Sequence, residues 1–142
     1  GAARRNNVEV TAALAGLARR PSVIFVSSGE VFDGSRAGTC ETDEASPINV
    51  YGRTKLEAER VVLANANHTV VRIVLTAGTS VSGDRSFVED MCRVAGTGGS
   101  LTLFSDEYRC PLPAGVIARA LWELLDHQQT GLYHLGWGVS AR

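Results

Sequence analysis

The sequence VIFVSSG, residues 23–29, predicts a buried parallel strand. Its first four residues are apolar without alternation, as expected of a strand in a parallel sheet that is covered on both faces. The run VVRIVL, residues 70–75, has the same character. Residues 49–66 lie between the two runs and form a predicted helix, for which Asn49 is a suitable N-cap. A helix between two such strands is the usual crossover of a parallel sheet.

The same alternation of helices and strands extends toward both ends of the chain. Periodic apolar residues predict further helices, and short apolar runs predict further strands. The predicted helices cover residues 6–19, 87–95 and 114–126, and the predicted strands cover residues 101–104 and 131–136. This order indicates a mostly parallel sheet between two layers of helices, which is a three-layer α/β/α architecture.

The composition is that of one ordinary soluble domain. The chain has 142 residues, of which 44% are hydrophobic and 20% are charged, and its formal net charge is −1. A nearly neutral chain has no bulk electrostatic attraction to nucleic acid or to an anionic membrane surface. No apolar stretch approaches the roughly 20 residues that a membrane span requires. We therefore expect neither nucleic acid nor a membrane as a partner.

The cysteines and histidines argue against a disulfide scaffold and against a metal site. Cys40, Cys92 and Cys110 are odd in number, are widely spaced and form no C-x-x-C pair, which suits a reducing cytoplasm. The three His residues are scattered and have no ligand spacing with a Cys or a carboxylate, so no metal is expected. We expect the cysteines, and Trp122 on the helix over residues 114–126, to lie in the core.

Tyr51 and Lys55 are the clearest candidates for chemistry. They are four residues apart on a predicted helix, so they share one face, one turn apart. Lys55 is the only Lys in a chain that uses Arg 13 times. A nearby ammonium lowers the pKa of a phenol from its free value of about 10, and such a phenol can pass a proton to or from a carbonyl or alcohol oxygen. The alternative is a surface Tyr and a surface Lys that are neighbours by chance.

Ser27 and Ser28 follow the apolar part of the first predicted strand. In an open parallel sheet, ligands bind at the carboxyl ends of the strands, so the Ser28 hydroxyl is placed to hold the oxygen that Tyr51 protonates. Ser28, Tyr51 and Lys55 together suit proton transfer coupled to hydride transfer at a carbinol carbon. They contain no electron carrier, so such a site requires a bound nicotinamide.

Several stretches resemble the extended short-chain dehydrogenase/reductase family. VIFVSSGEVFDG (23–34) and CETDEASPINVYGRTKLEAERVV (40–62) are similar to the region that carries the Ser/Thr, Tyr and Lys of that family. RNNVEVTAALAGLARR (5–20), TVVRIVL (69–75) and GLYHLG (131–136) resemble neighbouring elements. Within the family, the similarity is greatest to the dTDP-4-dehydrorhamnose reductases and their sugar-nucleotide-binding relatives.

The resemblance implies an oxidoreductase that reduces a 4-keto nucleotide sugar with NADPH or NADH. It makes Tyr51 the proton donor, Lys55 the group that lowers the pKa of Tyr51 and holds the nicotinamide ribose, and Ser28 the group that orients the keto oxygen. The implied cofactor contacts are Asn7, Ser27, Tyr51, Lys55, Ile73 and Val74, and the implied substrate contacts are Ser28, Glu30, Phe32, Leu75 and Arg109.

The resemblance also implies that residues 1–142 are the C-terminal part of a Rossmann-type domain, in which residues 78–115 contribute to a substrate-binding subdomain. The glycine-rich turn that holds a dinucleotide pyrophosphate is absent from this sequence. The chain starts at Gly1, and its only Met is Met91. We therefore expect a fragment of a longer cytoplasmic protein, for which a homodimer is one candidate assembly. The isolated fragment is expected to aggregate or oligomerise and to bind a dinucleotide weakly.

Two other functions stay open. A nucleotide-sugar 4-epimerase or dehydratase of the same family shares Ser28, Tyr51 and Lys55. A non-catalytic regulatory or binding subunit on the same fold is the alternative from another class, although such a subunit has no need to keep Lys55. Ser28-Gly29-Glu30 stands where the rhamnose-type reductases commonly have Thr-Asp-Tyr, which leaves the identity of the sugar open.

Overall fold

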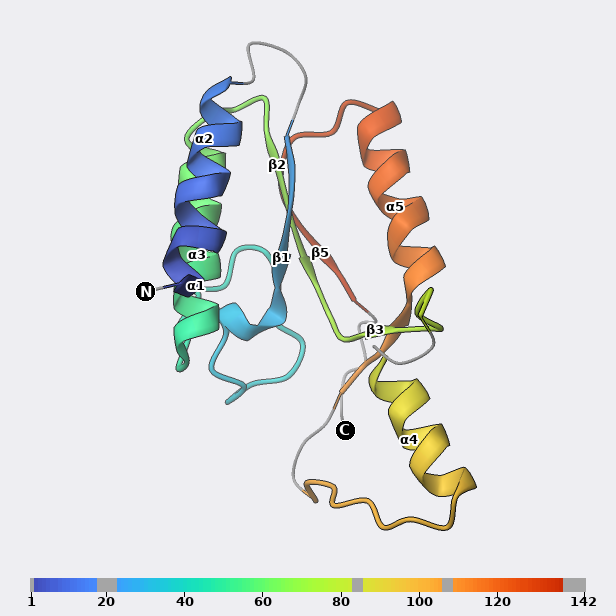
Figure 1. Ribbon diagram of the computed structural model, residues 1–142. Helices are drawn as coiled ribbons and strands as arrows, with labels where there is room; N and C mark the ends of the chain where they lie inside the picture. Colours follow the sequence, from blue (N-terminus) through green and yellow to red (C-terminus); the bar gives the residue numbers. More distant parts are fainter. Residues whose placement is uncertain (1, 18–22, 83–85, 106–108, 137–142) are drawn as a thin grey trace.

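A parallel sheet of three strands forms the centre of the structure (Figure 1). This computed structural model describes residues 2–17, 23–82, 86–105 and 109–136. The strands, in spatial order, are β1 (Ile24–Ser28), β2 (Thr69–Ile73) and β5 (Gly131–Leu135). Ser28 pairs with Ile73, and Ile73 pairs with Leu135, so the carboxyl ends of the three strands lie at one edge. The predicted parallel pairing is confirmed.

Helices cover both faces of this sheet (Figure 1). On one face lie α3 (Val50–Leu63) and an N-terminal helical run, and on the other lies α5 (Ala114–Asp126). The N-terminal run consists of α1 (Ala2–Arg4), the π-helical segment η1 (Arg5–Glu9) and α2 (Val10–Leu17). The predicted three-layer α/β/α architecture is therefore confirmed. The first helix begins earlier than predicted, and its expected last residues, 18 and 19, lie outside the described residues.

α3 begins where its capping residue predicts. The Asn49 side chain accepts a hydrogen bond from the Gly52 N–H at 2.7 Å, which satisfies a donor that the first turn of a helix leaves unpaired. Ala58 and Val62, which are four residues apart, have no exposed surface. The cap and this buried stripe together fix the helix that carries the candidate catalytic residues.

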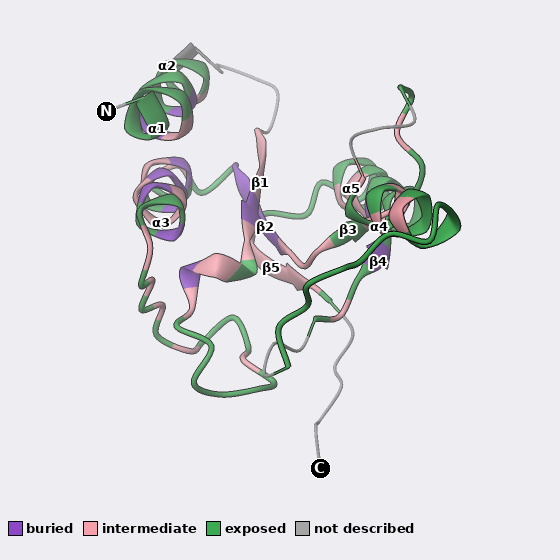
Figure 2. Cartoon of the chain, turned by 60° about the horizontal axis from the view of Figure 1, so that its bottom comes forward, coloured by how far each residue is buried: buried purple, intermediate pink, exposed green. Residues whose placement is uncertain are grey.

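The core lies between α3 and the sheet, where the buried residues of Figure 2 gather. In β2, the central strand, every residue before Ile73 is buried. β1 is only half-buried except at Ser27, because among the described strands it has a partner on one edge alone. Val70 and Val71 of β2 have no exposed surface, as expected of the central strand of a sheet that helices cover on both faces.

The segment between β2 and α5 differs from the predicted pattern. The strand predicted over residues 101–104 is wrong, because that segment is irregular and its Leu and Phe side chains are exposed. β3 (Thr76–Ala77) instead pairs in parallel with β4 (Leu112–Pro113). An apolar run becomes a strand only where a partner satisfies its backbone, and here β3 and β4 pair with each other. The helix predicted over residues 87–95 is confirmed as α4 (Phe87–Gly96), which lies away from the main sheet (Figure 1).

Two expectations about the core are wrong. Trp122 is 65% exposed, whereas Ile117 of the same helix is buried, because only one face of α5 is covered. Cys40 and Cys92 are exposed, and Cys110 is only partly buried. Cys40 lies in the loop before α3 and Cys92 on α4, so the position of each residue, rather than its small apolar side chain, sets its exposure.

Candidate functional site

The predicted catalytic residues lie around the carboxyl end of β1. Ser28 is the last residue of that strand and caps the short 3-10 helix η2 (Gly29–Val31), because its hydroxyl oxygen accepts a hydrogen bond from the Glu30 N–H at 3.2 Å. Tyr51 lies in the first turn of α3, and Lys55 lies one turn further on. Since α3 packs on both β1 and η2, the three residues share one end of the sheet.

Lys55 is anchored to the strand that ends in the serines. Its ammonium donates a hydrogen bond to the Val26 carbonyl at 2.9 Å and lies 4.7 Å from the centroid of the Phe25 ring. The same nitrogen is 5.8 Å from the centroid of the Tyr51 ring. Burial lowers the pKa of Lys55, and the carboxylate of Glu59 opposes that shift. Because an ammonium has three N–H donors, the bond to Val26 leaves further donors for a bound oxygen.

Tyr51 is 46% exposed, and the turn that carries it is held by the N-terminal helical run. Asn7 Nδ2 donates to Thr54 Oγ1 at 3.0 Å, and Thr54 Oγ1 donates to the Tyr51 carbonyl at 2.9 Å. Asn7, a predicted cofactor contact, is thus joined to the backbone of the first turn of α3. A half-exposed phenol beside an ammonium is accessible to a substrate oxygen and can exchange a proton with it.

Gly52 allows α3 to pack directly on η2. A Cβ atom at this position would overlap the carbonyl oxygen of Glu30 and would lie 2.9 Å from Cβ of Pro47. Only a residue without a side chain permits this approach. The approach sets how close the turn that carries Tyr51 comes to the strand end that carries Ser28.

Glu30 is held between two donors at the border of the site. Arg109 Nη1 donates to Glu30 Oε1 at 3.1 Å, and Asn49 Nδ2 donates to Glu30 Oε2 at 2.8 Å. These hydrogen bonds, first the one from Arg109 and then the one from Asn49, hold the pKa of the Glu30 carboxyl below its ordinary value. The two predicted substrate contacts, 79 residues apart in sequence, are thus brought together.

A buried ion pair that sequence reasoning did not predict lies next to Lys55. The Glu59 carboxylate accepts hydrogen bonds from Arg72 Nε at 3.0 Å and from Arg72 Nη2 at 2.7 Å. It also accepts one from the Ser27 hydroxyl at 2.5 Å, so the side chain of this predicted cofactor contact is engaged inside the protein. The available signal was Arg72 itself, since an Arg within an apolar strand requires a buried acidic partner.

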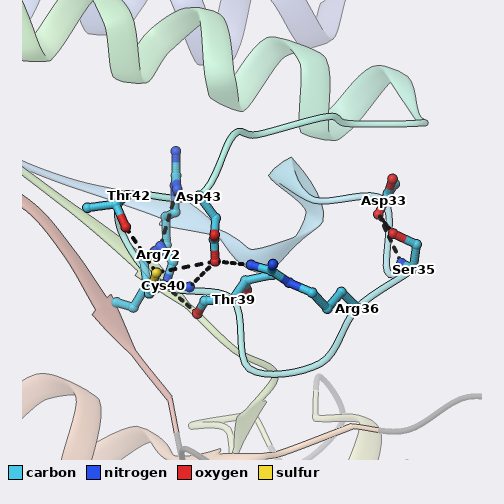
Figure 3. Close-up of polar contacts among 9 residues, drawn as sticks. Asp33, Ser35, Arg36, Thr39, Cys40, Thr42, Asp43 and Arg72 are labelled. Carbon is cyan, nitrogen blue, oxygen red and sulfur yellow. Dashed lines mark hydrogen bonds and ion pairs between the residues drawn. The ribbon is translucent and has the colours of Figure 1, made fainter.

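Arg72, the basic partner of this ion pair, also contacts the loop between β1 and α3. The guanidinium carbon of Arg72 lies 5.0 Å from the ring centroid of Phe32, a predicted substrate contact, and that ring is 5.7 Å from the His134 ring. Arg72 Nη1 is 3.2 Å from His134 Nε2, and His134 Nδ1 is 3.2 Å from the Thr39 carbonyl oxygen. Figure 3 shows Arg72 beside this loop.

The loop has polar contacts of its own (Figure 3). Asp43 accepts a hydrogen bond from the Cys40 N–H at 2.7 Å and forms an ion pair with Arg36. These contacts, with that from Arg36 the largest, hold the pKa of the Asp43 carboxyl well below its usual range. The loop between β1 and α3 is therefore held by contacts within the loop and by its contacts with Arg72.

Ile73, Val74 and Leu75 line the neighbouring strand end. Ile73 is the last residue of β2, whereas the sequence predicted a strand as far as Leu75. The strand ends early because the chain turns toward β4, where the Leu75 carbonyl accepts a hydrogen bond from the Leu112 N–H at 2.9 Å. All three residues are half-buried, and Ile73 is paired with Ser28 across the two strand ends.

We found no second candidate site among the described residues. A hollow of about 270 Å³ lies between α5 and β5, and none of the predicted site residues lines it. Within residues 2–17, 23–82, 86–105 and 109–136, no group of three or more His, Cys, Asp or Glu residues is arranged to hold a metal ion. No helix in the same part of the chain is long and apolar enough to cross a membrane.

Comparison with known proteins identifies relatives over nearly the whole chain. The RmlD substrate binding domain family matches residues 1–140. The dTDP-4-dehydrorhamnose reductase of Sinorhizobium fredii is 37% identical over 99% of this chain and 49% of that protein. The methionine adenosyltransferase 2 subunit beta of Danio rerio is 31% identical over 94% of this chain and 43% of that protein. The chain thus spans about half the length of these relatives.

Solved structures share the fold. A crystal structure of a dTDP-4-dehydrorhamnose reductase from Clostridium acetobutylicum matches with a TM-score of 0.82 at 28% identity, over 92% of this chain and 46% of that one. MoeE5, solved in complex with UDP-glucose and NAD, matches with a TM-score of 0.78 at 26% identity, over 95% of this chain and 49% of that one. The predicted Rossmann-type α/β class is confirmed by these likenesses.

Proposed function

The chain belongs to the RmlD substrate binding domain family, and on that premise we propose that the intact protein reduces a 4-keto nucleotide sugar, similar to dTDP-4-dehydrorhamnose, with NADPH or NADH. The observation that carries the proposal is the Lys55 ammonium, which lies beside the Tyr51 ring and on the strand that ends in Ser28. The reductase relative supports this reaction class, and the neighbour solved with UDP-glucose and NAD supports a nucleotide sugar and a nicotinamide cofactor as the ligands.

Tyr51 is the proposed proton donor. Its phenol gives a proton to the keto oxygen as negative charge develops there, and the Lys55 ammonium stabilises the phenolate that remains. The Ser28 hydroxyl donates a hydrogen bond to the same oxygen and orients the carbonyl. A reduced nicotinamide, when bound, would supply the hydride. The exposure of Tyr51 and the half-burial of Ser28 leave both groups accessible to a substrate.

The donors around Lys55 fit a nicotinamide ribose. An ammonium with spare N–H groups and a phenol on the same helical face can both bond to ribose hydroxyls. Asn7 acts on this contact through Thr54, which holds the turn of Tyr51. The backbones of Ser27, Ile73 and Val74 complete the proposed cofactor surface, since the Ser27 hydroxyl is bonded to Glu59.

Glu30, Phe32, Leu75 and Arg109 are the proposed substrate contacts beside Ser28. Arg109 offers a guanidinium for a phosphate oxygen, although its bond to Glu30 must then be shared or broken. Residues 78–115, which contain α4, are proposed to belong to the substrate-binding part, and α4 itself lies away from the main sheet. The homodimer stays a prediction.

A non-catalytic subunit is the second candidate function, because the methionine adenosyltransferase subunit is also similar to this chain. The partly buried Lys55 favours the enzyme, since burying part of an ammonium costs free energy without contributing to a purely structural role. A 4-epimerase or dehydratase keeps the same three residues and differs in its net use of cofactor.

The intact protein, mixed with NAD(P)H and a dTDP-linked 4-keto-6-deoxy sugar, is expected to oxidise cofactor mole for mole with the sugar reduced. Nicotinamide absorbance and product analysis measure the two amounts. Conversion of a nucleotide sugar that still carries its 4-hydroxyl group, without net oxidation or reduction of NAD(P), would assign the protein to the epimerase or dehydratase group. The absence of both reactions, with the protein folded, would favour the non-catalytic subunit.

A further inference from the structure

Glu59 occupies a position that the proposed reaction does not yet explain. It lies four residues after Lys55 and eight after Tyr51, so the three side chains follow one face of α3. Its residue exposure is 1%, and its carboxylate forms an ion pair with Arg72, whose exposure is 7%. A buried ion pair is seldom more stabilising than apolar residues of the same volume. Stability alone therefore does not explain why a carboxylate lies there.

The contacts of Glu59 join the three elements that carry the site. Through the Ser27 hydroxyl it is bonded to β1, one residue before Ser28. Through Arg72 it is bonded to β2, one residue before Ile73. Since Glu59 is itself on α3, a single carboxylate fixes the spacing between the helix and both strand ends. A shift of about 1 Å in such spacing can cost two orders of magnitude in rate.

Glu59 is also the charge that acts on Lys55. On the face of α3 that carries Lys55, the other titratable groups are Tyr51 and Glu59. From β1, the Phe25 ring and the Val26 carbonyl contact the ammonium, and neither is titratable. Burial disfavours the charged form of Lys55, and Glu59 opposes this effect.

Two other charged groups near α3 are paired with carboxylates of this helix. Arg72 of β2 is bonded to Glu59 itself, and Arg4 of the N-terminal run pairs with Glu57 at 2.6 Å on an exposed part of the helix. Glu59 is therefore the acidic group that acts on the Lys55 ammonium.

We propose that Glu59 is a positioning residue for the Ser28, Tyr51 and Lys55 site, one that locks α3 to β1 and β2 and supplies the negative charge on the face of α3 that carries Lys55. This role rests on the proposed reductase function. In this role the ion pair of Glu59 with Arg72 supports proton transfer by positioning Tyr51 and Lys55, without contact between either side chain and the substrate.

The test removes the charge of Glu59 without leaving Arg72 unpaired. The double variant Glu59→Gln with Arg72→Gln is made in the intact protein, and the titration of Lys55 is followed by NMR of isotope-labelled lysine, assigned by loss of the signal in Lys55→Arg. We expect Lys55 to titrate at lower pH than in the parent. On the alkaline limb of the pH profile, kcat is expected to fall about tenfold.

Three further variants make the result specific. Glu57→Gln, on the exposed part of the same helix, is expected to leave both the titration and the pH profile unchanged. Glu59→Asp retains the negative charge, and Lys55 is expected to titrate in this variant at a pH between those of the charge-free double variant and the parent. The pair Glu59→Met with Arg72→Leu is the second variant if the first does not fold, because apolar residues often replace a buried ion pair without loss of stability.

A folded charge-free variant in which Lys55 titrates as in the parent would overturn the proposal. Failure of both charge-free pairs to fold, while Glu57→Gln folds, would reduce Glu59 to a structural residue and overturn it as well. The NMR titration needs no substrate. A parent protein without reductase activity would therefore contradict the proposed function separately.

Discussion

Tyr51→Phe in the intact protein is expected to lower kcat roughly 100- to 10,000-fold, which is the usual contribution of a positioned general acid. The substitution removes only the hydroxyl, and Tyr51 is 46% exposed, so stability should hardly change. KM for the sugar is expected to change less than kcat, because the proton is transferred in the transition state and not in the bound ground state. Steady-state kinetics and thermal unfolding measure these effects.

Tyr133→Phe is the matched control. Tyr133 lies on β5, and its hydroxyl donates a hydrogen bond to Gln129 at 3.2 Å. Its kcat is expected to stay near the parental value. If Tyr51→Phe also retains near-parental kcat, Tyr51 is not the proton donor.

Gly52→Ala is expected to cause the second large effect. The new methyl group would overlap the Glu30 carbonyl, which is backbone and cannot rotate away. Overpacking of this kind costs about 1–3 kcal/mol, which exceeds the roughly 1 kcal/mol that Ala gains over Gly in a helix. Because α3 would move away from η2, kcat/KM should also fall about 100-fold. Chemical unfolding and steady-state kinetics test the two parts.

Gly115→Ala on α5 is the control for helix propensity. A Cβ atom there meets nothing within 4 Å, so the substitution should stabilise the protein slightly and leave kcat unchanged. Equal stabilisation by Gly52→Ala would contradict the close approach between α3 and η2.

The local chemistry of α3 and β2 made the central fold predictable. Asn49 gave the start of α3, and the apolar run around Val70 and Val71 gave a strand that is buried on both faces. The pair Tyr51 and Lys55 followed from helical spacing, and the structure places both at the end of β1. These features depend on residues that are close in sequence, so the sequence alone contained them.

Features that depend on distant partners were not predicted. Leu103 and Phe104 have the pattern of a strand but lie exposed, because the pairing in that region joins β3 to β4. The Ser27 hydroxyl is bonded to Glu59 because Arg72, from another strand, brings a buried charge that needs a carboxylate. Nothing within either local stretch specified those partners.

Transfer of deuterium from NAD(P)H to the sugar tests the central claim most directly. The intact protein is incubated with a 4-keto nucleotide sugar and with NAD(P)H that carries deuterium at the transferable position, and the product is analysed by mass spectrometry and NMR. The account predicts that deuterium appears on the former keto carbon, at a rate that Tyr51→Phe lowers as strongly as kcat. A reduced sugar without deuterium, or undiminished transfer in Tyr51→Phe, would contradict it.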